Sequence, residues 1–328
     1  MNGPLRMRID WRACKAPAMS RIVIAFDGSP SARVALERAG ELFPGAHATV
    51  VSVAQGVGAL AEASGAARAA LPDEVIRTAI ARLRDSALAD AQGLAEAACR
   101  DAAEAGLRAE SETVAAERSV WSAILEAVGE ADADAIVCGT HGHGVSVRAV
   151  LGSVAAGLVH HAQLPVLVVP EEARSASGPV LVAFDGSASS VAAVQVAGQL
   201  FPGRVTLVLH VWRSQLRHSL TGAAMRHAPL QEVRDIVGEL GRVLETSAQS
   251  TADAGVALAR EHGLQARPMT VESDDPVAQT IKRVASEVDA AVTVVARRGR
   301  GAVLGAILGS VSSSLIHASD GPLLVTPS

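Results

Sequence analysis

Short apolar runs alternate with longer helical segments along the chain. In the first half, most of these runs are rich in Val, Ile and Ala and too short for a helix, which is typical of buried strands. Because helical segments lie between successive strands, we expect an α/β fold with a parallel sheet, doubly wound by right-handed crossovers and covered by helices on both faces. The predicted strands are residues 21–26, 48–53, 108–115, 135–138 and 165–169, of which 108–115 has the weakest pattern.

The first predicted strand ends in a turn that starts a helix. The residues at 27–30 are Asp-Gly-Ser-Pro, which places Ser29 at the N-cap and Pro30 at the first helical position. The helix is expected to end before the Pro-Gly pair at 44–45. Parallel sheets of this class bind ligands beyond the carboxyl ends of their strands, so this turn is a candidate site.

The whole pattern occurs twice. The segment Ala-Phe-Asp-Gly-Ser at 25–29 recurs 158 positions later, and Leu-Gly-Ser-Val at 151–154 recurs 157 positions later. One register therefore spans the chain, which indicates a tandem duplication of one α/β unit. The predicted organisation is an N-terminal tail (1–19), a first unit (20–171), a polar small-residue linker (172–178) and a second unit (179–328).

The tail has no counterpart before the second unit. One interpretation is a disordered extension, or residues upstream of a natural start at Met19. The other is a docking arm that uses the basic residues of the tail. The sequence leaves both interpretations open.

Composition argues against several classes of protein. The 328 residues carry a net charge of −5, whereas nucleic-acid binders usually have a basic face. Aromatic residues make up 2% of the chain, with no Tyr, so a base-stacking surface is not expected. The three cysteines share no metal-ligand spacing, and no apolar run approaches the length of a membrane span. We expect a cytoplasmic protein that binds neither nucleic acid nor membranes.

A second candidate site is the Gly-rich stretch at 139–153, after the fourth predicted strand. Glycines allow the backbone to approach a ligand closely, and consecutive N–H groups form a concavity for anions. Ser153 opens a helix whose N-terminal N–H groups favour phosphate, and Gly152 leaves that end free of a Cβ. The stretch lacks the Gly-Lys-Ser/Thr of a P-loop, and it does not follow the first strand as a dinucleotide fingerprint does. It therefore indicates a polyphosphate held by backbone contacts.

The spacing within this stretch resembles a known pattern. Gly139-x2-Gly142-x9-Gly152-Ser153 is similar to the ATP-binding pattern of the universal stress protein family, Gly-x2-Gly-x9-Gly-Ser/Thr. The Asp-Gly-Ser turn and the Pro-Val-Leu-Val-Val strand at 165–169 also resemble that family, in two copies over residues 20–328. The resemblance implies two tandem Rossmann-like domains, each with five parallel strands in the order 3-2-1-4-5. It also implies that the last strands pair the two halves as an internal pseudo-dimer, and it leaves a homodimer open.

The resemblance assigns roles to residues of the first unit, all at strand ends or in the Gly-rich stretch. They are Ala25 and Val53 beside adenine, Asp27 near the ribose or a Mg²⁺ bound with ATP, Cys138 and Gly139 near the ribose, and Gly142, Gly152, Ser153 and Val154 at the phosphates. His141 lies between the two loop glycines, where a donor to phosphate is useful. No other metal site and no catalytic residue is expected.

The second unit departs from the pattern at one glycine. Ala296 replaces the first glycine, so a Cβ is expected where the backbone approaches the ligand. The arginines at 297, 298 and 300 offer the opposite effect, because their charge favours polyphosphate. Both outcomes stay open, and the first unit is the preferred ATP site. The residues kept in the second unit are Ala183, Asp185, Val211, Gly299, Gly309, Ser310 and Val311.

Three functions are compatible with this pattern. The first is an ATP-binding regulatory protein of stress physiology with little or no hydrolysis, because the loop supplies no obvious base or nucleophile. The second is an ATP pyrophosphatase or nucleotidyl transferase, which is disfavoured because Phe-Asp-Gly-Ser stands where those enzymes carry Ser-Gly-Gly-x-Asp-Ser. The third is a nucleotide-independent interaction scaffold that uses the sheet edges and long helices.

Overall fold

A computed structural model describes residues 20–55, 73–142, 151–174, 176–213, 230–299 and 308–327. The predicted tail at 1–19, with both of its interpretations, lies outside the described residues.

The first half alternates strands and helices in the predicted order. All five predicted strands are confirmed, with ends within one residue of the expected positions. Ser29 is the N-cap of the first helix and Pro30 its first residue, also as predicted. The elements are β1 (Arg21–Ala25), α1 (Pro30–Leu42), β2 (His47–Ala54), α3 (Asp73–Glu104), β3 (Arg108–Ala115), α4 (Val120–Glu130), β4 (Ala135–Gly139), α5 (Ser153–His161) and β5 (Val166–Val169).

The second half repeats this order. Ser187 caps its first helix through the side chain, as Ser29 does in the first half. The elements are β6 (Val180–Ala183), α6 (Ala188–Leu200), β7 (Val205–Trp212), α8 (Leu230–Glu261), β8 (Gln265–Glu272), α9 (Val277–Glu287), β9 (Val292–Ala296), α10 (Ser310–Ala318) and β10 (Leu323–Thr326).

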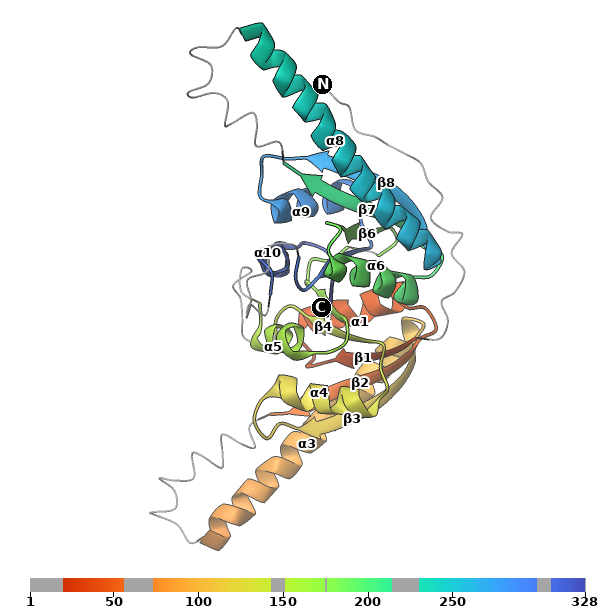
Figure 1. The fold of residues 1–328 in the computed structure, drawn as a ribbon. Helices are drawn as coiled ribbons and strands as arrows, with labels where there is room; N and C mark the ends of the chain where they lie inside the picture. Colours follow the sequence, from red (N-terminus) through yellow and green to blue (C-terminus); the bar gives the residue numbers. More distant parts are fainter. Residues whose placement is uncertain are drawn as a thin grey trace.

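The strands form one sheet of ten, in the order β3-β2-β1-β4-β5-β10-β9-β6-β7-β8 (Figure 1). Within each half the neighbouring strands are parallel and follow the order 3-2-1-4-5, which confirms the predicted fold. The last strands of the two halves, β5 and β10, pair antiparallel, with Leu167 opposite Leu324. The two units therefore share a single mixed sheet, which is joined at its centre by the last strand of each unit.

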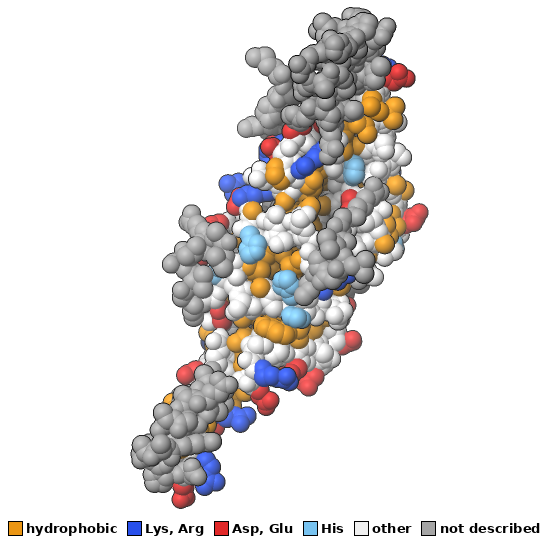
Figure 2. Space-filling model, turned by 60° about the vertical axis from the view of Figure 1, so that its left-hand side comes forward, with side chains coloured by type: hydrophobic (Ala, Val, Ile, Leu, Met, Phe, Trp, Pro, Cys, Tyr) orange, Lys and Arg blue, Asp and Glu red, His pale blue; other side chains and the backbone are white. Residues whose placement is uncertain are grey.

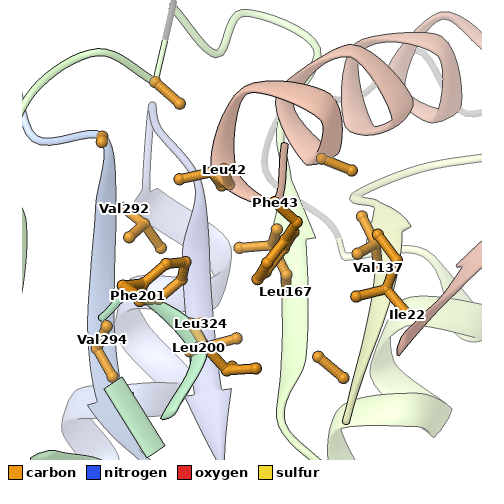
Figure 3. Close-up of a cluster of buried hydrophobic side chains, with 14 of the residues drawn as sticks. Ile22, Leu42, Phe43, Val137, Leu167, Leu200, Phe201, Val292, Val294 and Leu324 are labelled. Carbon is orange, nitrogen blue, oxygen red and sulfur yellow. The ribbon is translucent and has the colours of Figure 1, made fainter. Parts of the chain in front are cut away.

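Hydrophobic side chains cover both faces of this sheet. One layer contains residues of α1, α3, α6 and α8, and the other contains residues of α4, α5, α9 and α10. Both layers continue across the junction between the halves. In the first layer, Phe43 and Phe201 occupy equivalent positions after α1 and α6, and their rings stack with centroids 5.5 Å apart (Figure 3). The halves thus share one core and not merely one sheet.

The connection between the halves is fixed to both of them. Ala176 in the predicted linker is buried, and its N–H donates to Glu41 Oε2 at 2.5 Å. Its carbonyl accepts from Arg204 Nη1 at 3.1 Å, and Arg204 Nη2 donates to the Glu41 carbonyl at 2.8 Å. The predicted linker is therefore a packed connection, although its sequence is polar and rich in small residues.

The long helices α3 and α8 extend beyond the sheet at opposite ends of the molecule (Figure 1). They carry the exposed hydrophobic residues Val75, Leu83, Leu240 and Val243. On the face shown in Figure 2, histidine side chains lie near the middle of the molecule beside hydrophobic ones. Of the helices within the described residues, none combines the length and the apolar character that a membrane span requires.

Candidate functional site

The candidate site lies where β1 and β4 end side by side. These strands are parallel neighbours, with Ile24 opposite Val137, so the segments that follow them leave the same edge of the sheet. After β1 the chain turns toward β2 on one side, and after β4 it continues to β5 on the other. This is the switch point at which doubly wound sheets hold ligands.

The turn after β1 presents a carboxylate to the Gly-rich loop. Gly28 has a φ of +77°, which glycine adopts without strain, and the Ser29 N–H donates to Asp27 Oδ1 at 3.0 Å. The other carboxylate oxygen faces the loop, because a Cβ on Gly142 would lie 2.7 Å from Asp27 Oδ2. The structure therefore brings Asp27 and Gly142 together, and any side chain at 142 would collide with the carboxylate.

Two serines hold the loop against α1. Ser31 Oγ donates to the His141 carbonyl at 2.5 Å, and Ser29 Oγ donates to the same carbonyl at 3.2 Å. Gly139 lies against the same helix, since a Cβ there would be 2.8 Å from Ser31 C and 2.9 Å from Ala32 N. The sequence analysis missed Ser31, because its partner is 110 residues away and no local pattern indicates the contact.

The start of α5 closes over the loop. The Gly152 N–H donates to the Thr140 carbonyl at 2.8 Å, and a Cβ on Gly152 would lie 3.0 Å from that carbonyl oxygen. Gly152 is the N-cap and has no side chain to bond the first N–H groups of the helix, and Ser153 is exposed as the first helical residue. The first turn of a helix has N–H groups without intrahelical acceptors, so this end of α5 presents donors and positive potential.

The remaining candidate residues of the first unit are apolar and lie on the α4 and α5 face of the sheet. Ala25 and Cys138 belong to the hydrophobic layer of that face, and Val53 and Val154 pack against it. Burial raises the pKa of the Cys138 thiol to about 12, so the thiol is protonated at neutral pH. In the loop after β4, His141 Nε2 is buried and has no hydrogen-bond partner among the described residues.

The second unit builds the same turn. Gly186 has a φ of +76°, and the Ser187 N–H donates to Asp185 Oδ1 at 2.9 Å. A Cβ on Gly299 would lie 3.0 Å from Asp185 Oδ2, and the Gly309 N–H donates to the Arg297 carbonyl at 2.8 Å. The other candidates also keep their places: Ala183, Val211 and Val311 pack against the layer formed by α9 and α10, and Ser310 is exposed at the start of α10.

The loop of the second unit differs in what holds it and in where its side chains go. Ser312 Oγ, on α10, donates to the Arg297 carbonyl at 2.8 Å. Arg297 itself is 8% exposed, and its guanidinium donates to the carbonyls of His160 and Ala162 at the end of α5 in the first unit. The side chain of Arg297 is therefore not placed to bind phosphate in the second loop. This differs from the sequence-based alternative in which its charge favours polyphosphate there. Arg298 is exposed.

Ala296 also lies differently from the expectation. It packs against the hydrophobic layer that contains α6 residues, as the equivalent Gly139 lies against α1. Its methyl group therefore points into the core and away from the face that carries Ala183 and Val211. The sequence does not show which face of the sheet a strand-end residue occupies, and whether this Cβ obstructs a ligand stays a prediction.

Within the described residues, no group of three or more His, Cys, Asp or Glu side chains is arranged to hold a metal ion.

Comparison with known proteins identifies the class. The universal stress protein family matches residues 19–170 and again residues 177–327. Universal stress protein Rv1996 of Mycobacterium tuberculosis is 32% identical over 195 residues, which are 58% of this chain and 57% of that protein. The match thus spans little more than half of that relative's length.

One solved structure agrees on the fold over almost the whole chain. A universal stress protein from Archaeoglobus fulgidus has a TM-score of 0.58 at 19% identity, over 94% of this chain and 98% of that one. A universal stress protein from the same organism, solved in complex with dAMP, covers 46% of this chain and 97% of its own length at 22% identity, with a TM-score of 0.30.

The fold and the site define a tandem, doubly wound α/β protein whose two units present an aspartate turn and a Gly-rich loop at the same sheet edge. The chain belongs to the universal stress protein family, as a tandem member with two repeats of the family domain.

Proposed function

We propose that this protein binds ATP in its first unit and acts as a regulatory protein of stress physiology. The phosphates would lie between the loop at Gly142 and the first turn of α5, and the adenine would lie on the α4 and α5 face beside Ala25 and Val53. ATP is the ligand of choice because the spacing of residues 139–153 resembles the ATP-binding pattern of the family.

One observation carries the proposal. Asp27, the loop backbone at 141–142 and the start of α5 converge at the switch point of the sheet, and His141 Nε2, in the same loop, is buried without a partner in the part of the chain that the structure describes. A buried polar atom without a hydrogen bond is costly, and a ligand that supplies a partner removes that cost. The exposed Ser153 hydroxyl adds a donor beside the helix N–H groups.

The residues present also fit a Mg²⁺ bound with ATP. Mg²⁺ in nucleotide sites usually takes one or two carboxylates together with phosphate oxygens and water. Asp27 offers Oδ2 on the loop side, while Oδ1 is occupied by the Ser29 N–H. In the bound state the ion would supply charge neutralisation for the phosphates, and Asp27 would hold it toward the loop.

We propose that hydrolysis is slow or absent. The Cys138 thiol beside the site stays protonated, because burial raises its pKa to about 12, so it is a poor nucleophile. Asp27 is tied by one oxygen to the turn, which favours a binding role over a role in activating water.

The test starts with mass spectrometry of small molecules released on denaturing the purified protein, followed by ATP titration calorimetry. Gly152 is a poor position to mutate, since a Cβ there would meet the Thr140 carbonyl and displace the loop. Ser153→Ala is cleaner, because the side chain is exposed; we expect ATP affinity to fall about 10- to 100-fold, the loss of one hydrogen bond to a charged group.

Ser310→Ala is the matched control at the equivalent position of the second unit. If only Ser153→Ala weakens ATP, the first unit is the principal site; if only Ser310→Ala does, the assignment of the site is wrong. A wild-type protein that binds neither ATP nor ADP would refute the proposal.

A second candidate function is a nucleotide-independent scaffold. The exposed Val75 and Leu83 on α3, and Leu240 and Val243 on α8, favour it, because large apolar side chains on projecting helices are typical of contact surfaces. A full-length protein that binds no nucleotide, but loses a partner when Val75 and Leu83 are changed to Ser, would support this alternative.

A further inference from the structure

The Arg297 side chain crosses from the second unit into the first. Arg297 directly follows β9, and its guanidinium is buried against the end of α5. Nη2 donates to the carbonyl of Ala162, the C-cap of α5, and Nη1 donates to the His160 carbonyl at 3.4 Å. A residue of one unit therefore caps a helix of the other.

The backbone of Arg297 is held by hydrogen bonds, so the position from which its side chain extends is fixed. Its N–H donates to the Thr326 carbonyl of β10 at 2.9 Å. Its carbonyl accepts from the Gly309 N–H at 2.8 Å and from Ser312 Oγ at 2.8 Å. These three bonds join the loop after β9 to β10 and to the start of α10, all within the second unit.

The positive charge of Arg297 lies at the C-terminal end of α5. The last carbonyls of a helix lack intrahelical donors and carry the negative end of the helix dipole, so a cation there is favoured. Burying a guanidinium is expensive unless it is hydrogen bonded. Among the described residues, Nη1 and Nη2 of Arg297 donate to carbonyls of α5 and its C-cap, whereas Nε is buried without a hydrogen-bond partner. The bonds to the end of α5 thus compensate part of the cost of burying Arg297.

The opposite end of the same helix is the candidate phosphate site. α5 has nine residues and is about 13 Å long, so it moves as one short rigid body. At its start, Gly152 is bonded to the Thr140 carbonyl and Ser153 faces solvent. Fixing the C-terminal end therefore limits how far the N-terminal donors can shift from the loop at 140–142.

We propose that Arg297 is a positioning residue for the nucleotide site of the first unit: it holds α5 from the second unit and so keeps the phosphate-binding end of that helix in place. This inference rests on the proposed ATP site in the first unit. It assigns a function to the second unit that does not depend on whether the second unit binds nucleotide.

The second unit caps a helix of the first unit through Arg297, but the equivalent residue of the first unit does not cap a helix of the second. The equivalent position in the first unit is Thr140, which is 7% exposed and whose hydroxyl is buried without a hydrogen-bond partner. A threonine has no charged group to cap α10 as Arg297 caps α5. The contact between Arg297 and the end of α5 therefore has no counterpart from Thr140 to α10.

The test compares three variants of the full-length chain by ATP–Mg²⁺ titration calorimetry. Arg297→Met keeps length but removes the donors, Arg297→Lys keeps the charge and a donor, and Arg298→Met removes an exposed arginine from the same loop. We expect Arg297→Met to weaken ATP binding about fivefold, within the range by which residues outside a site alter affinity. Arg297→Lys should bind ATP more tightly than Arg297→Met. Arg298→Met should leave the ATP affinity of the site at Ser153 unchanged.

Two further measurements separate positioning from plain loss of stability. Hydrogen exchange should show faster exchange of the amides at 156–159, which begin the hydrogen-bonded part of α5, in Arg297→Met without nucleotide, under conditions where the protein is fully folded. The affinity losses of Arg297→Met and Ser153→Ala should be less than additive when combined, because both act on the start of α5.

The outcomes are distinguishable. If the wild type binds no ATP, the proposed function fails and this inference fails with it. If the wild type binds ATP but Arg297→Met matches it in affinity and in exchange at 156–159, the inference alone is overturned. Equal weakening by Arg297→Met and Arg298→Met would also overturn it, because a general effect of loop charge would then explain the result.

Discussion

The loops after β4 and β9 start from the same sequence pattern and are held by different neighbours. The loop of the first unit is tied to α1 by Ser31, whose hydroxyl bonds the His141 carbonyl. The loop of the second unit is tied to α10 by Ser312 and to α5 of the other unit by Arg297. Ala155 occupies the first-unit position equivalent to Ser312, whereas Ser189 retains the position of Ser31 in the second unit, so the serine on α10 is an anchor that the first unit lacks.

This difference teaches that the motif residues and the residues that support them diverge separately. Asp27 and Asp185 make the same bond to the N–H of the serine two residues on, and Gly142 and Gly299 face them in the same way. The aspartate turn and the loop glycine are thus common to both units. The contacts that fix each loop are specific to its unit, so the two sites can differ in affinity although their motifs are alike.

The largest expected effects test the likeness of the two halves. Phe43→Ala and Phe201→Ala each remove a fully buried ring from the stacked pair at the junction. Each should lower the free energy of unfolding by about 3–5 kcal/mol, the usual cost of Phe→Ala in a core. Denaturant unfolding of both variants measures this. A difference of more than about 2 kcal/mol between the two losses would mean that Phe43 and Phe201 do not contribute equally to the shared core.

The next effect concerns the position at which the loops differ in sequence. Gly139→Ala places a Cβ against backbone atoms of α1, which cannot move as a side chain can, so unfolding free energy should fall by about 1–3 kcal/mol. The reverse change, Ala296→Gly, removes a methyl group from the core and should cost about 1 kcal/mol or less. Thermal or denaturant unfolding compares the two. If Ala296→Gly instead raises ATP affinity in the second unit, the methyl group does obstruct the ligand.

A smaller effect is expected from the anchoring serines. Ser31→Ala and Ser312→Ala each remove one donor from a loop carbonyl that keeps a second donor, so each should cost about 1 kcal/mol. Hydrogen exchange should report the change separately in each loop: at 140–142 for Ser31→Ala and at 297–299 for Ser312→Ala. Faster exchange in both loops from one substitution would contradict independent anchoring.

The smallest effect is a pH dependence at the end of α5. Burial, with the neighbouring charges of His161 and Arg297, lowers the pKa of His160 in the folded protein. The unfolded chain therefore binds a proton at this residue at a pH where the folded chain does not, and stability is lost as the pH falls below about 6.5 toward the lowered value. His160→Gln should flatten this part of the stability profile, measured by denaturant unfolding between pH 5 and pH 8. His317→Gln, at the exposed equivalent position on α10, is the control.

The fold could be predicted from the sequence because its signals are local. Each strand is a short apolar run, and turns such as Asp27 to Pro30 carry their own cap and helix-start residues. The register of the repeat then placed Asp27 and the Gly-rich loop at the carboxyl ends of strands, which is where the structure brings them together.

The rest of the site could not be predicted because it depends on contacts between distant residues. Ser31 reaches His141 across 110 residues, and Arg297 reaches Ala162 across 135. Three arginines within four positions after a strand, at 297, 298 and 300, are typical of an anion site, yet the side chain of Arg297 packs against the other unit. The direction of the Ala296 methyl group likewise follows from the face of the strand, which a single residue does not reveal.

The antiparallel pairing of β5 with β10 joins two units that belong to one polypeptide. In a dimer of identical chains, every substitution at the junction appears twice, once on each side of the axis. Covalent linkage removes that constraint and also replaces a concentration-dependent association by an intramolecular one, with an effective concentration in the millimolar range for short connections. One side of the junction can then carry Arg297 while the other carries Thr140. The tandem arrangement thus allows one half to specialise as the support of the other, whatever the concentration of the protein.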